Sequence, residues 1–248
     1  MTTTGIIGDY PFDVTYICYD ETRYEEFLAV KHNRMKNNFM QLFQNMNIAT
    51  MNPPEIDLIR SPIRNCRQKC RFAIKGMHEL PAMNENENPE RIVHCMWEEG
   101  QPIVIVENFP IASIQIYNIM PILLNIIQSK EEYKCLVHGF SSVSYLSTLS
   151  ENIVITMNYD STNSDAFLQN IDNNYICQWK TKADNLLIEL MNQNIPNIQS
   201  ISLIGRMRGI KIIVGNDYVY ETLKLKDHRS LYYKQVEEGF SNPNSVVN

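Results

Sequence analysis

The chain has 248 residues, of which 44% are hydrophobic and 10% aromatic, enough apolar material for a sizeable core and too much for a chain that is disordered throughout. Its formal net charge is −6 and its pI about 5.4, which excludes a general electrostatic attraction to nucleic acid or to an anionic membrane. Six cysteines without disulfide-framework spacing, and a start (MTTTGIIGDY) without a signal-peptide pattern, predict a reduced, cytoplasmic protein.

The first predicted element is an amphipathic helix. From Tyr24 to Phe43 apolar residues recur every three or four positions, as on one face of a helix. The stretch MNPPE from Met51 to Glu55 then breaks the chain, and alternating patterns predict strands around Cys66 to Ile74 and Ile103 to Glu107.

The second half mixes helices and short strands. The window from Ile111 to Ser129 is long enough to span a bilayer, but its polar residues fall on one side at helical spacing, which indicates an amphipathic core helix. A second such helix carries Ala183, Leu186, Leu187, Leu190 and Met191, and strands are predicted at Ile153 to Met157, Ile201 to Ile204 and Ile210 to Val214.

These elements predict an α+β fold with a mostly antiparallel sheet and flanking amphipathic helices, because strands and helices do not alternate regularly. Neither G-x-G-x-x-G nor a Walker-type pattern occurs in the sequence. We therefore expect no complete Rossmann-like domain in this chain.

The stretch RSPIRNCRQKCRFAIK, Arg60 to Lys75, concentrates basic residues without an acid. On a strand, Arg67, Lys69 and Arg71 would lie on one face, with Cys70 and Phe72 on the other. Such a face suits the phosphates of a nucleic acid, but it also suits a charged edge strand that resists aggregation, and the pattern leaves both interpretations open.

A second acid-free interval contains LIGRMRGIKIIV. Gly205 and Gly209 predict a tight turn between two strands, with Arg206 and Arg208 near its tip. The turn is placed to contact a phosphate backbone, although the pattern favours an ordinary exposed hairpin.

Catalytic and metal-binding patterns are weak. Cys135 and His138 are close in sequence, whereas nucleophile and base usually come from distant segments. Cys66, Cys70, His94 and Cys95 have poor spacing for tetrahedral zinc. We therefore assign no catalytic residue and no metal ligand.

Several stretches, taken together and in order, carry a family resemblance. RYEEFLAVKHNRMKNNF, RSPIRNCRQKCRFAI, VENFPIAS, VSYLSTLSENIVITM, SLIGRMRGIKIIVGNDYVYETL and YYKQVEEGFSNPN resemble the N-terminal half of bacterial tRNA (uracil-5-)-methyltransferases, from about Arg23 onward. That family methylates C5 of the T-loop uridine of tRNA, using S-adenosylmethionine, a cysteine nucleophile and a glutamate base. The uridine must leave the stacked loop to react.

The resemblance implies a domain division: an N-terminal extension at 1–22, an RNA-binding domain with an antiparallel sheet at 23–230, and at 231–248 the start of a connection to a methyltransferase domain. None of the six cysteines corresponds to the family nucleophile. It thus implies a truncated, non-catalytic tRNA-binding portion that contacts the T arm, not DNA or a membrane. S-adenosylmethionine would serve the complete enzyme but not bind this chain alone. The resemblance leaves three alternatives open: a fragment, a truncated gene product, or one piece of a split enzyme whose methyltransferase domain is a separate chain.

This sequence matches the family's motifs at some residues and departs from them at others. Arg67 and Lys69 match two cations of the family's strand, Arg71 replaces a typical Glu, and Ala73 replaces an arginine. Asn242 stands where the family has a glutamine that helps to bind the methyl donor, and it is one methylene shorter. The implied RNA-binding residues are Arg60, Arg67, Lys69, Arg71, Phe140, Tyr145, Arg206 and Arg208, with Phe140 or Tyr145 meeting loop bases.

An alternative of a different class stays open. The chain would then be a decayed or repurposed domain that acts as a non-catalytic RNA-binding or protein-interaction module. Ala73, Asn242 and the loss of an aromatic residue at Cys66 favour this alternative.

Overall fold

The computed structural model describes residues 6–7, 10–11, 20–46, 55–80, 88–96, 103–159, 172–207 and 209–244. The chain divides into two compact units, residues 1–63 with residue 247 and residues 64–246 with residue 248. The boundary between the units lies inside the stretch 23–230 that the resemblance assigns to one RNA-binding domain. That domain assignment stays a prediction.

The first unit is built on one long helix. α1 runs over Tyr24–Asn45, which confirms the helix expected at 24–43. A short 3₁₀ turn, η2 at Glu21–Arg23, leads into it, and the Asp20 side chain caps this turn by accepting a hydrogen bond from the Thr22 N–H. The unit also contains a small antiparallel pair, β1 at Ile6–Ile7 and β2 at Tyr10–Pro11.

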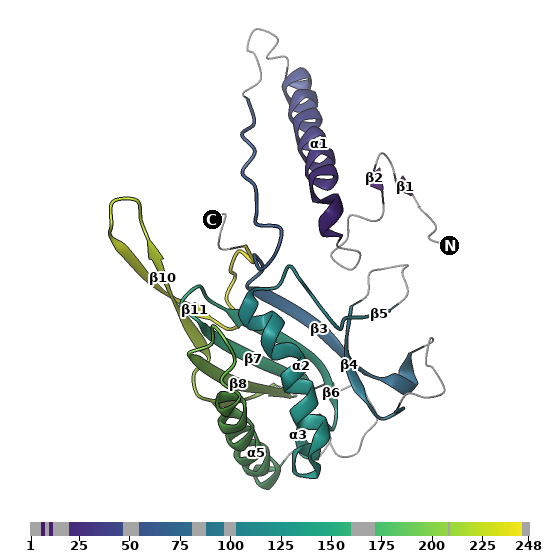
Figure 1. Cartoon of the computed structure of the whole chain (residues 1–248), viewed down its shortest axis with the longest axis vertical. Coiled ribbons are helices and arrows are strands. Elements are labelled where there is room, and N and C mark those ends of the chain that lie inside the picture. The colour runs from purple at the N-terminus through teal and green to yellow at the C-terminus, as the bar shows by residue number, and fades with distance from the viewer. Residues whose placement is uncertain are drawn as a thin grey trace. The chain divides into compact units, whose positions relative to one another are not determined.

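The second unit contains a seven-stranded sheet in the order β5-β4-β3-β6-β7-β8-β9 (Figure 1). Every neighbouring pair is antiparallel except β7 and β8, which are parallel and joined through a helix. The α+β fold with a mostly antiparallel sheet is therefore confirmed. The strands are β3 Lys69–Gly76, β4 Ile92–Met96, β5 Val104–Ile105, β6 Phe140–Ser147, β7 Asn152–Tyr159, β8 Ser200–Met207 and β9 Ile210–Val214.

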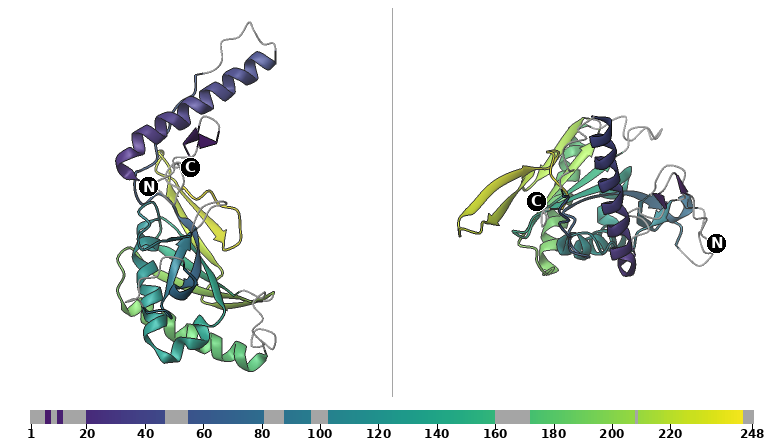
Figure 2. Two further views of the ribbon diagram at one scale, coloured as in Figure 1. Left: turned by 90° about the vertical axis from the view of Figure 1, so that its right-hand side faces the viewer. Right: turned by 90° about the horizontal axis from the view of Figure 1, so that it is seen from above.

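Helices cover one face of this sheet (Figure 2). They are α2 Ile114–Ser129, α3 Lys134–Val137 and α5 Asn173–Asn192, with the 3₁₀ turn η4 Glu131–Tyr133. A further 3₁₀ turn, η3 Met77–Glu79, follows β3, and its Met77 packs with Ala73, Val93 and Cys95. α2 confirms the amphipathic core helix expected from 111 to 129: Ile116, Ile119 and Leu123 are fully buried. Among the residues that the structure describes, no helix is long and apolar enough to cross a membrane.

Trp179 of α5 sits against the backbone of β8. Its indole is fully buried, and Nε1 donates a hydrogen bond to the Tyr159 hydroxyl at 2.8 Å. A Cβ added at Gly205 would lie 2.6 Å from this ring. Gly205 thus permits close packing within a strand, and only Gly209, with φ +78°, belongs to the turn between β8 and β9. This corrects the prediction of a turn bounded by both glycines.

A separate hairpin follows the sheet: β10 at Tyr218–Lys224 pairs with β11 at Ser230–Val236. The Glu221 carboxylate is fully buried and anchors β10 to the β6–β7 turn. It accepts hydrogen bonds from the Leu149 N–H at 2.8 Å and from the Ser150 hydroxyl at 3.2 Å.

Gly205→Ala should destabilise the fold by about 1–3 kcal/mol, because the new methyl group overpacks against Trp179. Denaturant unfolding, followed by circular dichroism, measures this. Ser144→Ala, on the sheet face away from the helices, serves as the control and should change the unfolding free energy by less than about 0.5 kcal/mol. Equal stability of the two variants would contradict the packing argument.

Candidate nucleic-acid interface

The sheet face opposite the helices is polar along two rows that cross the strands. One row aligns Arg71 with Ser144 and Thr156. The next aligns Ala73, Ser142, Asn158, Arg206 and Lys211. Because side chains alternate along a strand, the intervening residues, such as Phe72 and Cys70, face the helices and are buried. We call the polar side the open face.

Three predicted cations come together at the start of β3. The strand begins at Lys69, so Arg67 lies just before it, in isolated bridges to Ala112 and Asn244. Arg67 Nε donates to the Lys69 carbonyl at 3.1 Å, Lys69 Nζ to the Gly239 carbonyl at 2.9 Å, and Arg71 to the Ser142 hydroxyl at 3.1 Å. For Lys69 and Arg71 the acceptors are a backbone carbonyl and a hydroxyl, which hold these two side chains in place without neutralising their charge.

Arg206 joins the same site from β8. Together with Arg67, Lys69 and Arg71 it lines a pocket of about 560 Å³ that also includes Ser144 and Asn158. Arg206 is therefore inside a strand, which corrects its predicted place at the tip of a turn. Arg208, also predicted near the tip, lies outside the described residues, and Arg60 belongs to the first unit, where it forms an ion pair with Glu25.

Two acids balance Arg206. Its guanidinium lies 2.6 Å from Glu237 and 2.8 Å from Glu238, and Lys211 Nζ lies 3.6 Å from Glu237. Burial raises the pKa of Glu237, but hydrogen bonds from Arg206 and Thr156 outweigh it, so the pKa falls below its ordinary value of 4.5. Sequence reasoning missed both acids, because no local pattern links them to an arginine about thirty positions earlier in the chain.

Phe140 and Tyr145 lie on the helix side of β6, away from the open face. Phe140 packs on Tyr159 with ring centroids 5.9 Å apart, and the fully buried Tyr145 places its hydroxyl 2.9 Å from His94 Nε2. Burial lowers the pKa of His94 to about 3, so the imidazole is neutral. Both aromatic rings belong to the core here, and their contact with loop bases stays a prediction.

Three of the described cysteines have thiol pKa values above the ordinary range. Burial raises the pKa of Cys70 to about 12 and that of Cys95 to about 11, and it also raises the pKa of Cys135, which disfavours the thiolate that a nucleophile needs. Within the described residues no group of three or more His, Cys, Asp or Glu side chains is arranged to hold a metal ion.

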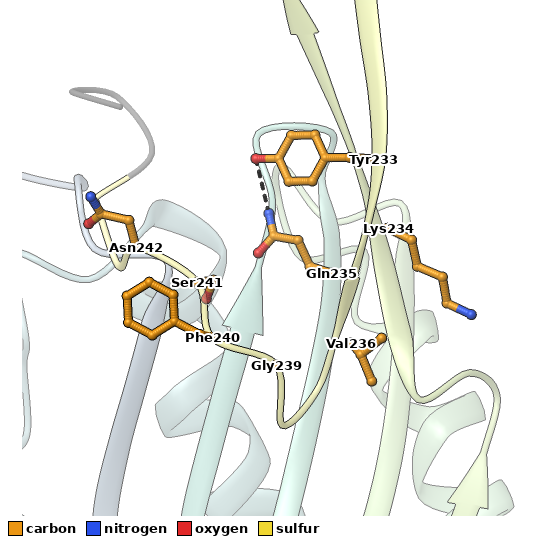
Figure 3. A pocket seen from close by; sticks show the side chains of 8 residues that line it. All are labelled: Tyr233, Lys234, Gln235, Val236, Gly239, Phe240, Ser241 and Asn242. Atoms are coloured by element: carbon orange, nitrogen blue, oxygen red, sulfur yellow. Dashed lines mark hydrogen bonds between the residues drawn. The ribbon is translucent and has the colours of Figure 1, made fainter.

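Asn242 lines a second pocket, of about 360 Å³, between β11 and the segment that follows it (Figure 3). Its side-chain oxygen accepts a hydrogen bond from the Asn244 N–H at 3.2 Å. The neighbouring Ser241 hydroxyl is buried and has no hydrogen-bond partner among the described residues. The segment is held beside β3, because the Gln68 N–H donates to the Pro243 carbonyl at 2.7 Å.

Fold and site thus define an α+β domain whose sheet is covered on one side and presents clustered cations on the other. Residues 23–248 match the tRNA (Uracil-5-)-methyltransferase family, and the chain belongs to that family.

Curated relatives agree with this placement. A tRNA/tmRNA (uracil-C(5))-methyltransferase from Actinobacillus pleuropneumoniae serotype 5b (strain L20) is 32% identical over 81% of this chain and 48% of its own length. Relatives with the same name from Aeromonas salmonicida (strain A449) and Psychromonas ingrahamii are 30% and 28% identical, over 81% and 92% of this chain and 45% and 52% of their own lengths. The chain spans about half the length of the curated relatives it matches.

Replacing Glu237 tests the ion pairs of the open face. Because its folded-state pKa is lowered, the carboxylate stabilises the fold fully above its unfolded value, and this contribution is lost as the pH falls through the folded-state pKa. Glu237→Gln should therefore cost about 1.5–3 kcal/mol at neutral pH and progressively less below about pH 4.5.

Urea unfolding of both proteins across this pH range measures the difference. The control, Glu238→Gln, removes a carboxylate with 67% of its side chain exposed and should have little effect at any pH. A Glu237→Gln deficit that stays constant on acidification would contradict the assignment.

Proposed function

We propose that residues 23–248 are the tRNA-binding portion of a cytoplasmic, S-adenosylmethionine-dependent tRNA uracil-5-methyltransferase that acts on the T-loop uridine. The 248-residue chain by itself would bind the T arm without methylating it. The observation that carries the proposal is the gathering of Arg67, Lys69 and Arg71 with Arg206 around one pocket on the open face.

The charges along this pocket indicate where the RNA backbone would run. At the β3 side, Lys69 and Arg71 are held by a carbonyl and a hydroxyl, so their charge is available to phosphates. At the β8 side, Glu237 and Glu238 neutralise Arg206 and repel a phosphate. The backbone would therefore follow β3, where Ser144 of the neighbouring β6 adds a hydrogen-bonding group for the sugar or for base edges.

The pocket beside Asn242 supports a contact with the methyl donor. Its lining combines the Asn242 and Gln235 amides with the Phe240 ring, and the buried Ser241 hydroxyl lacks a hydrogen-bond partner among the described residues. These groups fit the polar edges and flat ring of S-adenosylmethionine, and we propose that Asn242 holds one such edge when the cofactor, which supplies the methyl group, is bound.

The second candidate is a binding module without tRNA specificity. Two observations favour it: the position of the family's arginine is taken by the buried Ala73, and Arg206 is neutralised by two carboxylates. A module of this kind would ignore T-arm RNA at physiological salt.

Lys69→Gln/Arg71→Gln should weaken binding to a T-arm RNA hairpin at least about tenfold and reduce the slope of log affinity against log salt by roughly 1 to 2, because two phosphate contacts are lost. Fluorescence anisotropy over a salt series measures both quantities. The control, Lys180→Gln/Lys182→Gln, removes the same charge from α5 on the helix side and should change neither. Wild-type affinity and slope in the β3 variant would refute the interface.

Methyl transfer is tested separately. The chain, incubated with T-arm RNA and S-adenosylmethionine labelled in its methyl group, should leave the RNA without label, because no cysteine matches the family nucleophile. Label at C5 of the T-loop uridine would overturn the non-catalytic part of the proposal and leave the binding part intact.

A further inference from the structure

The β10–β11 hairpin presents an unusual surface on the side of its strands opposite Tyr233 and Gln235. The hairpin extends beyond the edge of the seven-stranded sheet (Figure 1), and in Figure 3 Lys234 and Val236 point away from Asn242. The pairing register assigns one further set of side chains to the face of Lys234 and Val236: Tyr218, Tyr220, Thr222, Lys224, Ser230 and Tyr232. We call this set, with Lys234 and Val236, the tyrosine face.

The tyrosine face combines large aromatic side chains with cations and contains no acid. Tyr232 is 75% exposed and Tyr220 is 55% exposed. Lys234 Nζ lies 3.6 Å from the centroid of the Tyr218 ring, and the Tyr218 and Tyr220 rings are 5.2 Å apart, edge to face. Rings and cations are thus interleaved across the two strands in a protein whose net charge is −6.

The hairpin is fixed at its base, so the tyrosine face is a preformed platform. The buried Glu221 carboxylate accepts hydrogen bonds from the Leu149 N–H and the Ser150 hydroxyl, and the Ser150 hydroxyl in turn accepts one from the Thr222 N–H at 2.9 Å. Val219 packs with Leu146, Val154 and Ile204. Because the anchoring side chains, Val219 and Glu221, lie on the opposite side of β10, binding at the tyrosine face requires no rearrangement of them.

We propose that the tyrosine face is a second RNA contact, on which unpaired bases stack against Tyr220 and Tyr232 while Lys224 and Lys234 contact the flanking phosphates. Aromatic side chains alternating with cations are the chemistry that single-stranded nucleic acid requires, since every base has a π-face and every linkage a negative charge. A protein partner would be expected to bury a more apolar centre and to pair the lysines with acids. The inference rests on the proposed function in taking the RNA to be tRNA.

Tyr220→Ala/Tyr232→Ala should weaken binding of the T-arm hairpin at least about tenfold, with the salt slope nearly unchanged because no cation is removed. Tyr220→Phe/Tyr232→Phe keeps the rings and should bind within about twofold of wild type, since stacking does not need the hydroxyl. Leu231→Ala, on the other face of the same hairpin, should bind like wild type and controls for damage to the hairpin. Anisotropy measures all four proteins.

Two further measurements distinguish failure of the tyrosine-face proposal from failure of the proposed tRNA function. Photocrosslinking of wild type to 4-thiouridine-labelled T-arm RNA should give adducts at Tyr220 or Tyr232, and adducts confined to β3 would overturn the proposal. If wild type does not bind the T arm, the tRNA function fails, and single-stranded oligouridine then tests the tyrosine face alone. Oligouridine binding that disappears in the alanine variant would support RNA binding at the tyrosine face.

The proposal is refuted if the alanine variant binds both RNAs like wild type. Sedimentation of the same proteins tests the alternative that the tyrosine face binds another protein molecule. A change in oligomeric state in the alanine variant, with RNA binding intact, would assign the tyrosine face to a protein contact and overturn the RNA assignment.

Discussion

Within the described part of the second unit, helices cover one face of the seven-stranded sheet, and this asymmetry separates the roles of neighbouring strand residues. Residues that point toward α2 and α5 must fill a close-packed layer, which is why Trp179 can sit directly on Gly205. Of the residues that point the other way, Leu146, Val154 and Ile204 are buried beneath Val219 of the hairpin, whereas Arg71, Ser144 and Arg206 line the pocket of the open face. Alternation along the strands therefore separates a helix-facing core from a second side, part of which is buried and part of which is available to a ligand.

Backbone hydrogen bonds at the start of β3 connect the open face to other segments of the second unit. The Arg67 N–H donates to the Ile111 carbonyl, the Ser113 N–H donates to the Arg67 carbonyl, and the Gln68 N–H donates to the Pro243 carbonyl. Backbone groups thus connect three segments that are far apart in sequence. As a consequence, the first cations of β3, the start of α2 and the segment that carries Asn242 form one rigid neighbourhood.

Charge is distributed unevenly within that neighbourhood. The cations of β3 are held by neutral acceptors, whereas Arg206 and Lys211 share the carboxylate of Glu237. A polyanion would therefore meet a gradient across the open face, attractive at β3 and nearly neutral at β8. Together with the acid-free tyrosine face on β10 and β11, this arrangement explains how a chain of net charge −6 can present localised surfaces suited to RNA.

The sequence by itself determined the elements with strong periodicity: α1, α2 and α5, most of the sheet's strands, the antiparallel character of the fold and the cation cluster of β3. Periodicity is local, so it also separated Arg71 from Phe72 onto opposite faces. Only the tertiary structure decided which face of β6 the helices cover, and this placed Phe140 and Tyr145 in the core. The tertiary structure also decided that Gly205 packs on Trp179 and that Glu237 neutralises Arg206. Contacts between residues distant in the chain depend on the order of the strands and on the packing of the layers, and local sequence patterns do not encode either of them.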